Sequence, residues 1–467
     1  MTTLWSGRFD AAPDQAAFEW GSSFSFDRRL FEDDVTGSIA WARALEKAGV
    51  LSHQEAIAID TALTSILEQG RSDPAFVNGP DEDVHSFVER LLVERLGDAG
   101  KRLHTGRSRN EQVSLDLRLY LKRRIPLLQR AVAEVVRAFA DQARAAGDAL
   151  MPAYTHFRPA QPVLVAHFLL AHVAPLRRDH ERLARAAEEA NVMPLGSGAI
   201  AGTSYPIDVK ALAADLGFDR VVANSIDASS DRDFAAAFLY ASALTMVHLS
   251  RLAEDLIILC GDEHRFFEFS DALSTGSSMM PQKKNPDPLE LVRGKTGRSI
   301  GDLLALLTTL KGIPSGYNKD LQEDKHAVFD AEDTLTGCLA VVKSVVRGLS
   351  LNRERAARAA SGQLLATDVA DYLVGKGVPF RRAHEVVGAL VRRLVAEERE
   401  FGSLSVSEWR AASDLFEPDV LKRVTPDASV RAKQTPQSTS PSAVNAAMAD
   451  VEGWLTTALL PLENQLC

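Results

Sequence analysis

Hydrophobic residues recur along most of this chain with the spacing of an α-helix. From Phe234 onward they return at steps of three, four and their sums, which places them on one face of a long helix. The positions that form this stripe are Phe238, Ala241, Leu249, Leu252, Leu256 and Leu259. Similar long runs begin near Asn110, Pro162, Pro286 and Gln322, whereas no region shows sustained alternation of apolar and polar residues. The pattern predicts a mainly α fold.

Long helices rich in alanine and leucine pack side by side in a bundle, and a bundle too apolar for one chain usually has partner chains. We therefore expect a central bundle of long helices in a homo-oligomer. The pattern predicts three domains: an N-terminal helical domain at residues 1–105, a central helical-bundle domain at 106–360, and a C-terminal helical domain at 361–467, where SGQLLATD begins a more ordinary helical pattern.

Composition restricts the class of protein. The 467 residues are 46% apolar and 25% charged, as in folded, water-soluble chains, and a net charge of −10 without a Lys/Arg stripe argues against a general nucleic-acid binder. Three widely spaced cysteines, Cys260, Cys338 and Cys467, fit a reducing compartment. The first residues lack a secretory pattern, and no apolar segment approaches the ~18 residues of a membrane span. We expect a cytoplasmic protein that is neither exported nor anchored in a membrane.

The segment TGSSMMPQKKN at residues 275–285 fits neither a helix nor a strand. It lacks the spacing of a nucleophile elbow and of a Ser-x-x-Lys motif, so covalent acyl chemistry is not expected. Asn285 as N-cap and Pro286 at the first helical position predict that a helix follows, with Glu290 near its start. A plain interhelical loop with solvated lysines is the alternative for this segment taken alone.

Two further segments predict helix starts that carry arginine. HTGRSRNEQ has Ser108 and Glu111 at capping-box spacing, and SSDRDF has Ser230 and Asp233 around Arg232. Free backbone N–H groups and the positive end of the helix dipole favour anions at such positions. With the helix start after residue 285 they indicate a substrate with several carboxylates, and simple capping is the alternative for each one.

Two other segments supply titratable side chains. AYTHFRPAQPV places Thr155 and His156 among prolines that keep the segment out of regular helix. DEDVHSFVE places Asp83 and His85 at a predicted helix start, where acidic residues favour the helix dipole and also suit a cationic substrate group. A structural role is the alternative for a lone histidine.

In combination these segments resemble the fumarase/aspartase superfamily and, within it, the argininosuccinate lyase family. The resemblance runs from Leu4 to about Lys325 in the family order, and it is weaker beyond residue 360. It rests on LWSGRF, EDVH, KRLHTGRSRNEQVSLDLRL, YTHFRPAQP, PLGSGAIAGT, SDRDF, GSSMMPQKKNPD and GIPSGYNKDLQEDK. It implies a three-domain, mainly α homotetramer with active sites shared between subunits, and reversible cleavage of argininosuccinate to arginine and fumarate.

The resemblance also implies roles for individual residues. Ser277 is expected to be the base on a mobile loop, and Lys283 and Asn285 to bind the carboxylate that takes up charge. His156, oriented by Glu290, is expected to donate a proton. The implied substrate-binding residues are Ser23, Asp83, His85, Ser108, Arg109, Asn110, Thr155, Arg232, Asn285, Tyr317, Gln322 and Lys325. A β-elimination needs no redox step and no metal, so no cofactor is expected.

Two alternatives remain open. Another fumarate-releasing lyase of the superfamily, such as adenylosuccinate lyase, needs basic residues for a phosphate near the N-terminal motifs, where DEDVH is acidic. A lyase-derived structural protein of the crystallin type does not need the catalytic set that this chain keeps. The chain departs from the family pattern at Met279 and at Arg158-Pro159, and neither is an expected catalytic position.

Overall fold

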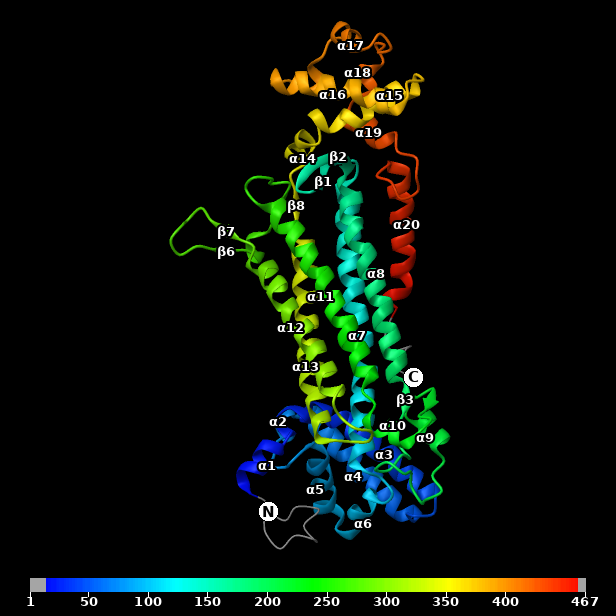
Figure 1. Cartoon of the computed structure of the whole chain (residues 1–467). Coiled ribbons are helices and arrows are strands. Elements are labelled where there is room, and N and C mark those ends of the chain that lie inside the picture. Colours follow the sequence, from blue (N-terminus) through cyan, green and yellow to red (C-terminus); the bar gives the residue numbers. More distant parts are fainter. Residues whose placement is uncertain (1–13, 461–467) are drawn as a thin grey trace.

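The protein is an elongated helical molecule with long helices at its centre (Figure 1). The structure is a computed structural model that describes residues 14–460, so the LWSGRF segment and Cys467 lie outside the described residues. One group of short helices covers one end of the long helices, and a second group lies beyond the other end (Figure 1). Among the helices of residues 14–460, none combines the length and apolar character needed to cross a membrane.

The central bundle confirms the long helical runs read from the sequence. Its helices are α7 (Arg109–Ala146), α8 (Val165–Ala190), α11 (Asp233–Cys260), α12 (Asp287–Leu310) and α13 (Asp324–Arg347). The predicted apolar stripe of α11, from Phe238 to Leu259, is buried. Helix α7 packs against α8 and α13, while α11 packs against α8, α12 and α13. The prediction of a mainly α fold with a long-helix bundle is confirmed.

Short helices surround the N-terminal end of α7. They are α1 (Gln15–Gly21), α2 (Phe24–Asp27), η2 (Arg28–Leu30), α3 (Phe31–Lys47), α4 (His53–Ser72), η3 (Pro74–Phe76), α5 (Val84–Leu96), α6 (Asp98–Lys101) and η4 (Arg102–His104). Side-chain caps set several of these starts: Ser52 and Glu55 form a capping box at α4, and Asp83 caps α5. Buried residues of these helices join those of the bundle in one continuous core.

A hairpin follows the C-terminal end of α7. Strands β1 (Leu150–Thr155) and β2 (Arg158–Leu164) pair antiparallel, and the turn residues His156 and Phe157 have φ of 54° and 57°. The other strands of the described residues come in pairs of two-residue strands: β3 (Val192–Met193) with β4 (Arg220–Val221), β5 (Phe267–Glu268) with β8 (Ser350–Leu351), and β6 (Thr275–Gly276) with β7 (Lys284–Asn285). Short helices between them are α9 (Val209–Asp215), α10 (Ser225–Ser230), η5 (Asp271–Leu273) and η6 (Lys319–Glu323).

The C-terminal part has a second hydrophobic core of its own, between Leu365 and Val424. Its elements are α14 (Arg353–Ala359), η7 (Gly362–Leu365), α15 (Ala366–Gly375), α16 (Phe380–Ala396), η8 (Phe401–Ser403), α17 (Val406–Ala412), α18 (Val420–Arg423) and α19 (Pro426–Arg431). The last helix, α20 (Pro441–Ala458), returns to the bundle and packs on α7 and α8. The division into domains at residues 105 and 360 stays a prediction.

Two predicted helix starts are wrong, and one is confirmed. Ser108 and Glu111 form the expected capping box. Helix α12 begins at Asp287 with Pro286 as N-cap, because Asn285 pairs with Thr275 across β6 and β7 and stays extended. Ser230 does not cap α11, because it is the last residue of α10. The residue at the N-cap of α11 is Arg232, whose side chain makes no capping hydrogen bond.

Glu332 on α13 joins three parts of this architecture. Its buried carboxylate accepts hydrogen bonds from Arg124 Nε at 3.1 Å and Tyr120 Oη at 3.2 Å, both on α7, and pairs with Arg29 of η2. The bundle and the N-terminal helices therefore share one buried negative charge.

We expect Glu332→Gln to lower the free energy of unfolding by about 2 kcal/mol. Breaking a buried ion pair costs ~3 to 5 kcal/mol, and the partial exposure of Arg29 and Arg124 reduces this loss. Thermal unfolding at equal protein concentration measures the effect. Asp333, which also pairs with Arg29 but is exposed, supplies the control: Asp333→Asn should cost less than about 1 kcal/mol. Equal losses would contradict the role of the buried carboxylate.

Candidate active site

A cavity of about 470 Å³ lies where the N-terminal helices meet the start of α7 and the segment before α13. It brings together many predicted substrate-binding residues from distant parts of the sequence, namely Ser23, Asp83, His85, Ser108, Arg109, Asn110, Tyr317, Gln322 and Lys325. The remaining lining residues are Asp27, Glu82, Glu89, His104, Val113 and Lys319. Most of these side chains are charged or polar, so the cavity suits a polar ligand.

The N-terminus of α7 opens into this cavity. Ser108 Oγ accepts the Asn110 N–H at 3.3 Å, while the two oxygens of Glu111 accept the N–H groups of Ser108 at 3.1 Å and Gly198 at 3.0 Å. Gly198 has φ of 57°, and a Cβ there would lie 2.5 Å from the Gly202 carbonyl oxygen, so the GSGAIAG turn requires glycine. Burial raises the pKa of Glu111 to about 7. The positive end of the helix dipole favours an anion at this position.

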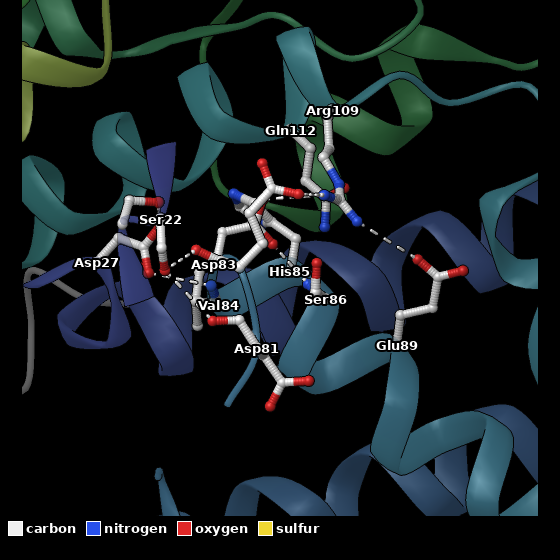
Figure 2. Close-up of polar contacts among 12 residues, drawn as sticks. Ser22, Asp27, Asp81, Asp83, Val84, His85, Ser86, Glu89, Arg109 and Gln112 are labelled. Atoms are coloured by element: carbon white, nitrogen blue, oxygen red, sulfur yellow. Dashed lines mark hydrogen bonds and ion pairs between the residues drawn. The ribbon is translucent and has the colours of Figure 1, made fainter. Parts of the chain in front are cut away.

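Acidic groups lie beside this anion-binding position. Arg109 Nη1 contacts Asp83 Oδ2 at 3.0 Å, and its Nη2 lies 3.9 Å from Glu89 (Figure 2). Asp83 Oδ1 also accepts the Ser86 N–H at 2.7 Å. Burial opposes the ionisation of Asp83, but His85 and Arg109 hold its pKa below the ordinary value. The cavity therefore offers both signs of charge to a ligand that carries both.

Ser23 and Asp27 form the side of the cavity next to α5. Their side chains are hydrogen-bonded to each other, and Asp27 Oδ1 accepts the Val84 N–H at 3.0 Å. The Ser23 N–H donates to the Glu82 carbonyl at 2.8 Å. The first short helices are thus joined to the start of α5 by backbone and side-chain hydrogen bonds.

A buried charge cluster supports the opposite side. Asp324 accepts hydrogen bonds from Arg232 Nε at 2.5 Å and Lys325 Nζ at 2.6 Å, and all three side chains are buried. Burial opposes the ionisation of Asp324, but the two cations hold its pKa below the ordinary value. Arg232 is not among the residues that line the cavity, so it acts on Lys325 through Asp324. Burial also raises the pKa of the nearby Tyr317 to about 12.

Thr155 and His156 lie far from this cavity. They are at the end of β1, after the C-terminus of α7, whereas Ser108 to Asn110 are at its N-terminus. The 38 residues of α7 span about 57 Å at 1.5 Å per residue. Both side chains are exposed. One chain therefore does not bring the expected proton donor to the expected substrate site.

The segment 275–285 is a loop that projects away from the bundle, joined at its base by β6 and β7 (Figure 1). Ser277 Oγ accepts the backbone N–H groups of Met279 at 3.3 Å and Met280 at 3.0 Å. Lys284 binds Asp271 at 2.9 Å, so this lysine anchors the loop. The Lys283 N–H donates to the Met280 carbonyl at 3.1 Å, but within residues 14–460 its exposed side chain makes no hydrogen bond or ion pair.

Asn285 and Glu290 lie at the foot of this loop. Asn285 Nδ2 donates to Thr275 Oγ1 at 3.4 Å. Glu290 is exposed on the first turns of α12, and its carboxylate is 3.9 Å from Arg293 Nη2. Among the described residues it makes no hydrogen bond or ion pair with His156. The 24 residues of α12, about 36 Å, separate this end from the segment that carries Tyr317 and Gln322.

Several cavity residues were not identified from the sequence. They are the lining residues Asp27, Glu82, Glu89, His104 and Lys319, together with Asp324, which contacts the lining residue Lys325. Asp27 is four residues after Ser23, a spacing that brings two side chains together on a helix, and this signal was available. Lys319 and Asp324 lie within the GIPSGYNKDLQEDK segment, but their type alone does not distinguish them from solvated charges.

Comparison with known proteins extends these observations over nearly the whole chain. A lyase family model matches residues 7–301, and a model of the argininosuccinate lyase C-terminal region matches residues 363–431. The argininosuccinate lyase of Pelotomaculum thermopropionicum is 49% identical over 445 residues, which cover 95% of this chain and 97% of that protein. The argininosuccinate lyase of Roseiflexus sp. (strain RS-1) is 49% identical over 446 residues, which cover 96% and 98%.

Solved structures share the fold. EDDS lyase in complex with formate matches with a TM-score of 0.82 at 26% identity, covering 98% of this chain and 95% of that chain. A fumarate lyase from Mesorhizobium sp. BNC1 matches with a TM-score of 0.73 at 20% identity, covering 95% and 99%. Because relatives that are 49% identical cover at least 95% of this chain and the C-terminal model matches separately, the chain belongs to the argininosuccinate lyase family of the fumarase/aspartase superfamily.

Proposed function

We propose that this protein catalyses the reversible β-elimination of argininosuccinate to L-arginine and fumarate, a step of arginine biosynthesis. The observation that carries the proposal is the cavity at the start of α7, where Arg109, Lys325 and the helix N-terminus lie beside Asp83 and Glu82. Argininosuccinate has three carboxylates, an ammonium group and a substituted guanidinium, so it needs both kinds of partner. The names of the relatives support the same substrate.

In this proposal Ser277 removes the proton beside a carboxylate of the succinyl part. The N–H groups of Met279 and Met280 already point at its Oγ and would stabilise a negative charge there. Lys283 and Asn285 would bind the carboxylate that becomes an aci-carboxylate, since Lys284 is occupied by the loop anchor. His156, with Glu290, would protonate the departing guanidinium nitrogen.

We further propose a homotetramer in which several chains complete each active site. Support comes from the distances above, because the cavity is held at one end of the long helices, and the hairpin turn and the loop at the other (Figure 1). Apolar side chains are also exposed along α12 and on the neighbouring α11: Leu291, Ile300, Leu304, Leu307 and Tyr240. An apolar face of this length on long helices is the surface that a second copy would cover.

Cytoplasmic location is part of the same proposal. Cys260 and Cys338 are free thiols in the described residues, which is compatible with a reducing compartment. Cell fractionation with an antibody against the protein would test this assignment.

The reaction itself is tested by incubating the purified protein with argininosuccinate, adenylosuccinate, malate and aspartate. We expect fumarate absorbance to rise with argininosuccinate alone. Release of fumarate from adenylosuccinate instead would replace the proposed substrate, and a lack of activity on all four would support a structural protein.

We expect Ser277→Ala to lower kcat for argininosuccinate by about 10³-fold, because general base catalysis contributes ~10² to 10⁴. The loop lies at the surface, so the fold and the assembly should not change. Steady-state kinetics and size-exclusion chromatography measure the two properties. Ser278→Ala, one residue along the same exposed loop, is the matched control and should stay within about threefold of the parent. Retention of most activity in Ser277→Ala would assign the base elsewhere.

His156→Asn should lower kcat by about 10²-fold while KM changes little, because the removed group donates a proton after substrate has bound. Asparagine is the appropriate replacement, since residue 156 has a φ of 54° and asparagine tolerates this region. An unchanged kcat, or a loss confined to KM, would move the donor role to another residue.

Shared active sites predict that two inactive variants rescue each other. Asn110→Asp, which places negative charge in the cavity, and Ser277→Ala alter groups at opposite ends of the long helices. When the two chains are refolded together, some sites of the hybrids receive both intact parts, and activity should return well above that of either variant. Native mass spectrometry confirms hybrid formation. Hybrids that stay inactive would contradict sites built from several chains.

A further inference from the structure

The side chain of His85 on α5 contacts two buried carboxyl groups, those of Asp34 and Asp116, which do not line the cavity. Its Nδ1 lies 2.8 Å from Asp34 Oδ1 on α3 and 3.3 Å from Asp116 Oδ2 on α7. The side chains of Asp34 and Asp116 have no exposed area, and that of His85 is 4% exposed. Because Nδ1 faces the carboxyls, Nε2 is the ring nitrogen left for the cavity that His85 lines.

The two carboxyl groups differ in their partners. Asp34 Oδ1 accepts hydrogen bonds from His85 and from the Gln112 amide. Both oxygens of Asp116 lack a hydrogen-bond partner among the described residues, although the group is fully buried. An ionised carboxylate in this state would be very costly, whereas a neutral carboxyl costs much less. The contacts therefore place the negative charge on Asp34 and a proton on Asp116.

The electrostatic environment agrees with this division. Burial and the charge of Asp34 both raise the pKa of Asp116 well above its ordinary value. Burial opposes the ionisation of Asp34, but His85 holds its pKa below the ordinary value. The pKa of His85 is raised, since Asp34 and other carboxylates outweigh the effect of burial. The charged or titratable groups that face His85 are Asp27, Asp34, Asp83, His104 and Asp116, and Arg107 acts on Asp34 and Asp116 behind it.

Two nearby carboxylates, Asp83 and Asp27, already have other partners, so the side chain of His85 is available to a ligand. Asp83 is occupied by Arg109 and the Ser86 N–H, and Asp27 by Ser23 and the Val84 N–H.

A metal ion in place of the proton fits less well, because Gln112 donates to the same oxygen of Asp34 as His85. The buried Arg107 guanidinium also adds positive charge to both carboxyls.

We propose that Asp34 is a positioning residue: the Asp34 carboxylate holds His85 as a cation whose Nε2–H binds a carboxylate of the substrate, while the neighbouring Asp116 carboxyl is neutral and takes no part in holding that charge. The substrate part of this inference rests on the proposed function. Asp34→Asn removes the charge that keeps His85 protonated, whereas Asp116→Asn replaces a neutral carboxyl by a neutral amide of the same shape. The two substitutions form a matched pair.

For argininosuccinate cleavage we expect Asp34→Asn to raise KM by at least about tenfold, with a smaller effect on kcat. Loss of substrate affinity with rising pH should also move to lower pH, because His85 then gives up its proton earlier. Asp116→Asn should leave KM and the pH profile within about threefold of the parent. A structural role alone would lower thermal stability without moving the pH profile.

A second readout does not depend on turnover. Diethyl pyrocarbonate modifies neutral imidazole, so mass spectrometry of the modified peptides between about pH 5 and pH 9 reports when His85 loses its proton, with the exposed His384 as reference. In the parent protein His85 should react only at higher pH than His384. The difference should disappear in Asp34→Asn and persist in Asp116→Asn.

Three results would overturn the proposal. They are reaction of His85 at the same pH as His384 in the parent protein, equal shifts in both variants, and a stoichiometric metal ion in the purified protein that Asp116→Asn releases. If the protein does not cleave argininosuccinate but the modification pattern holds, the proposed substrate fails while the charge state of the cluster stands. If Asp34→Asn does not fold, the comparison of His85 with His384 in the parent protein still decides.

Discussion

The length of α7 is the constraint on which the rest of the structure depends. A helix of 38 residues holds the cavity at one end and the β1–β2 turn at the other, and no side chain reaches across that span. Helix α12 imposes a similar separation between the loop that carries Ser277 and the segment that carries Tyr317. The rigid helices therefore keep the cavity apart from the residues expected at the turn and on the loop, and under the proposed function these parts meet only when chains assemble.

Charged side chains in and behind the wall-forming residues of the cavity are paired with one another. Asp324 lies between Arg232 and Lys325, Asp83 lies beside Arg109, and Asp34 lies beside His85. Removing each of these ions from water is unfavourable, and the partner charge offsets that loss during folding. Side chains fixed in this way need little rearrangement when substrate charges enter, which is the condition for electrostatic stabilisation of a transition state.

The sequence indicated the parts of the fold that local rules determine. Periodicity predicted the long helices, and the capping box at Ser108 was recognisable because both of its side chains are close in sequence. Asn285 and Ser230 were misassigned as helix caps, because Asn285 pairs with Thr275 across β6 and β7 and Ser230 ends α10. The two-residue strands are too short to show a period.

In the candidate site, too, local sequence patterns indicated some features, whereas contacts between distant residues determine others. Motifs shared with the family supplied most of the cavity lining. Lys284 differs from Lys283 because its ammonium contacts Asp271, Glu268 and the Phe269 carbonyl, and no local pattern predicts these contacts. The small C-terminal core begins after α14 and ends before α20. Both of these flanking helices contact the bundle or its hairpin. Because this core is separate and its segment is held at both ends, its sequence can change without shifting the register of the long helices. This agrees with the separate family models for residues 7–301 and 363–431.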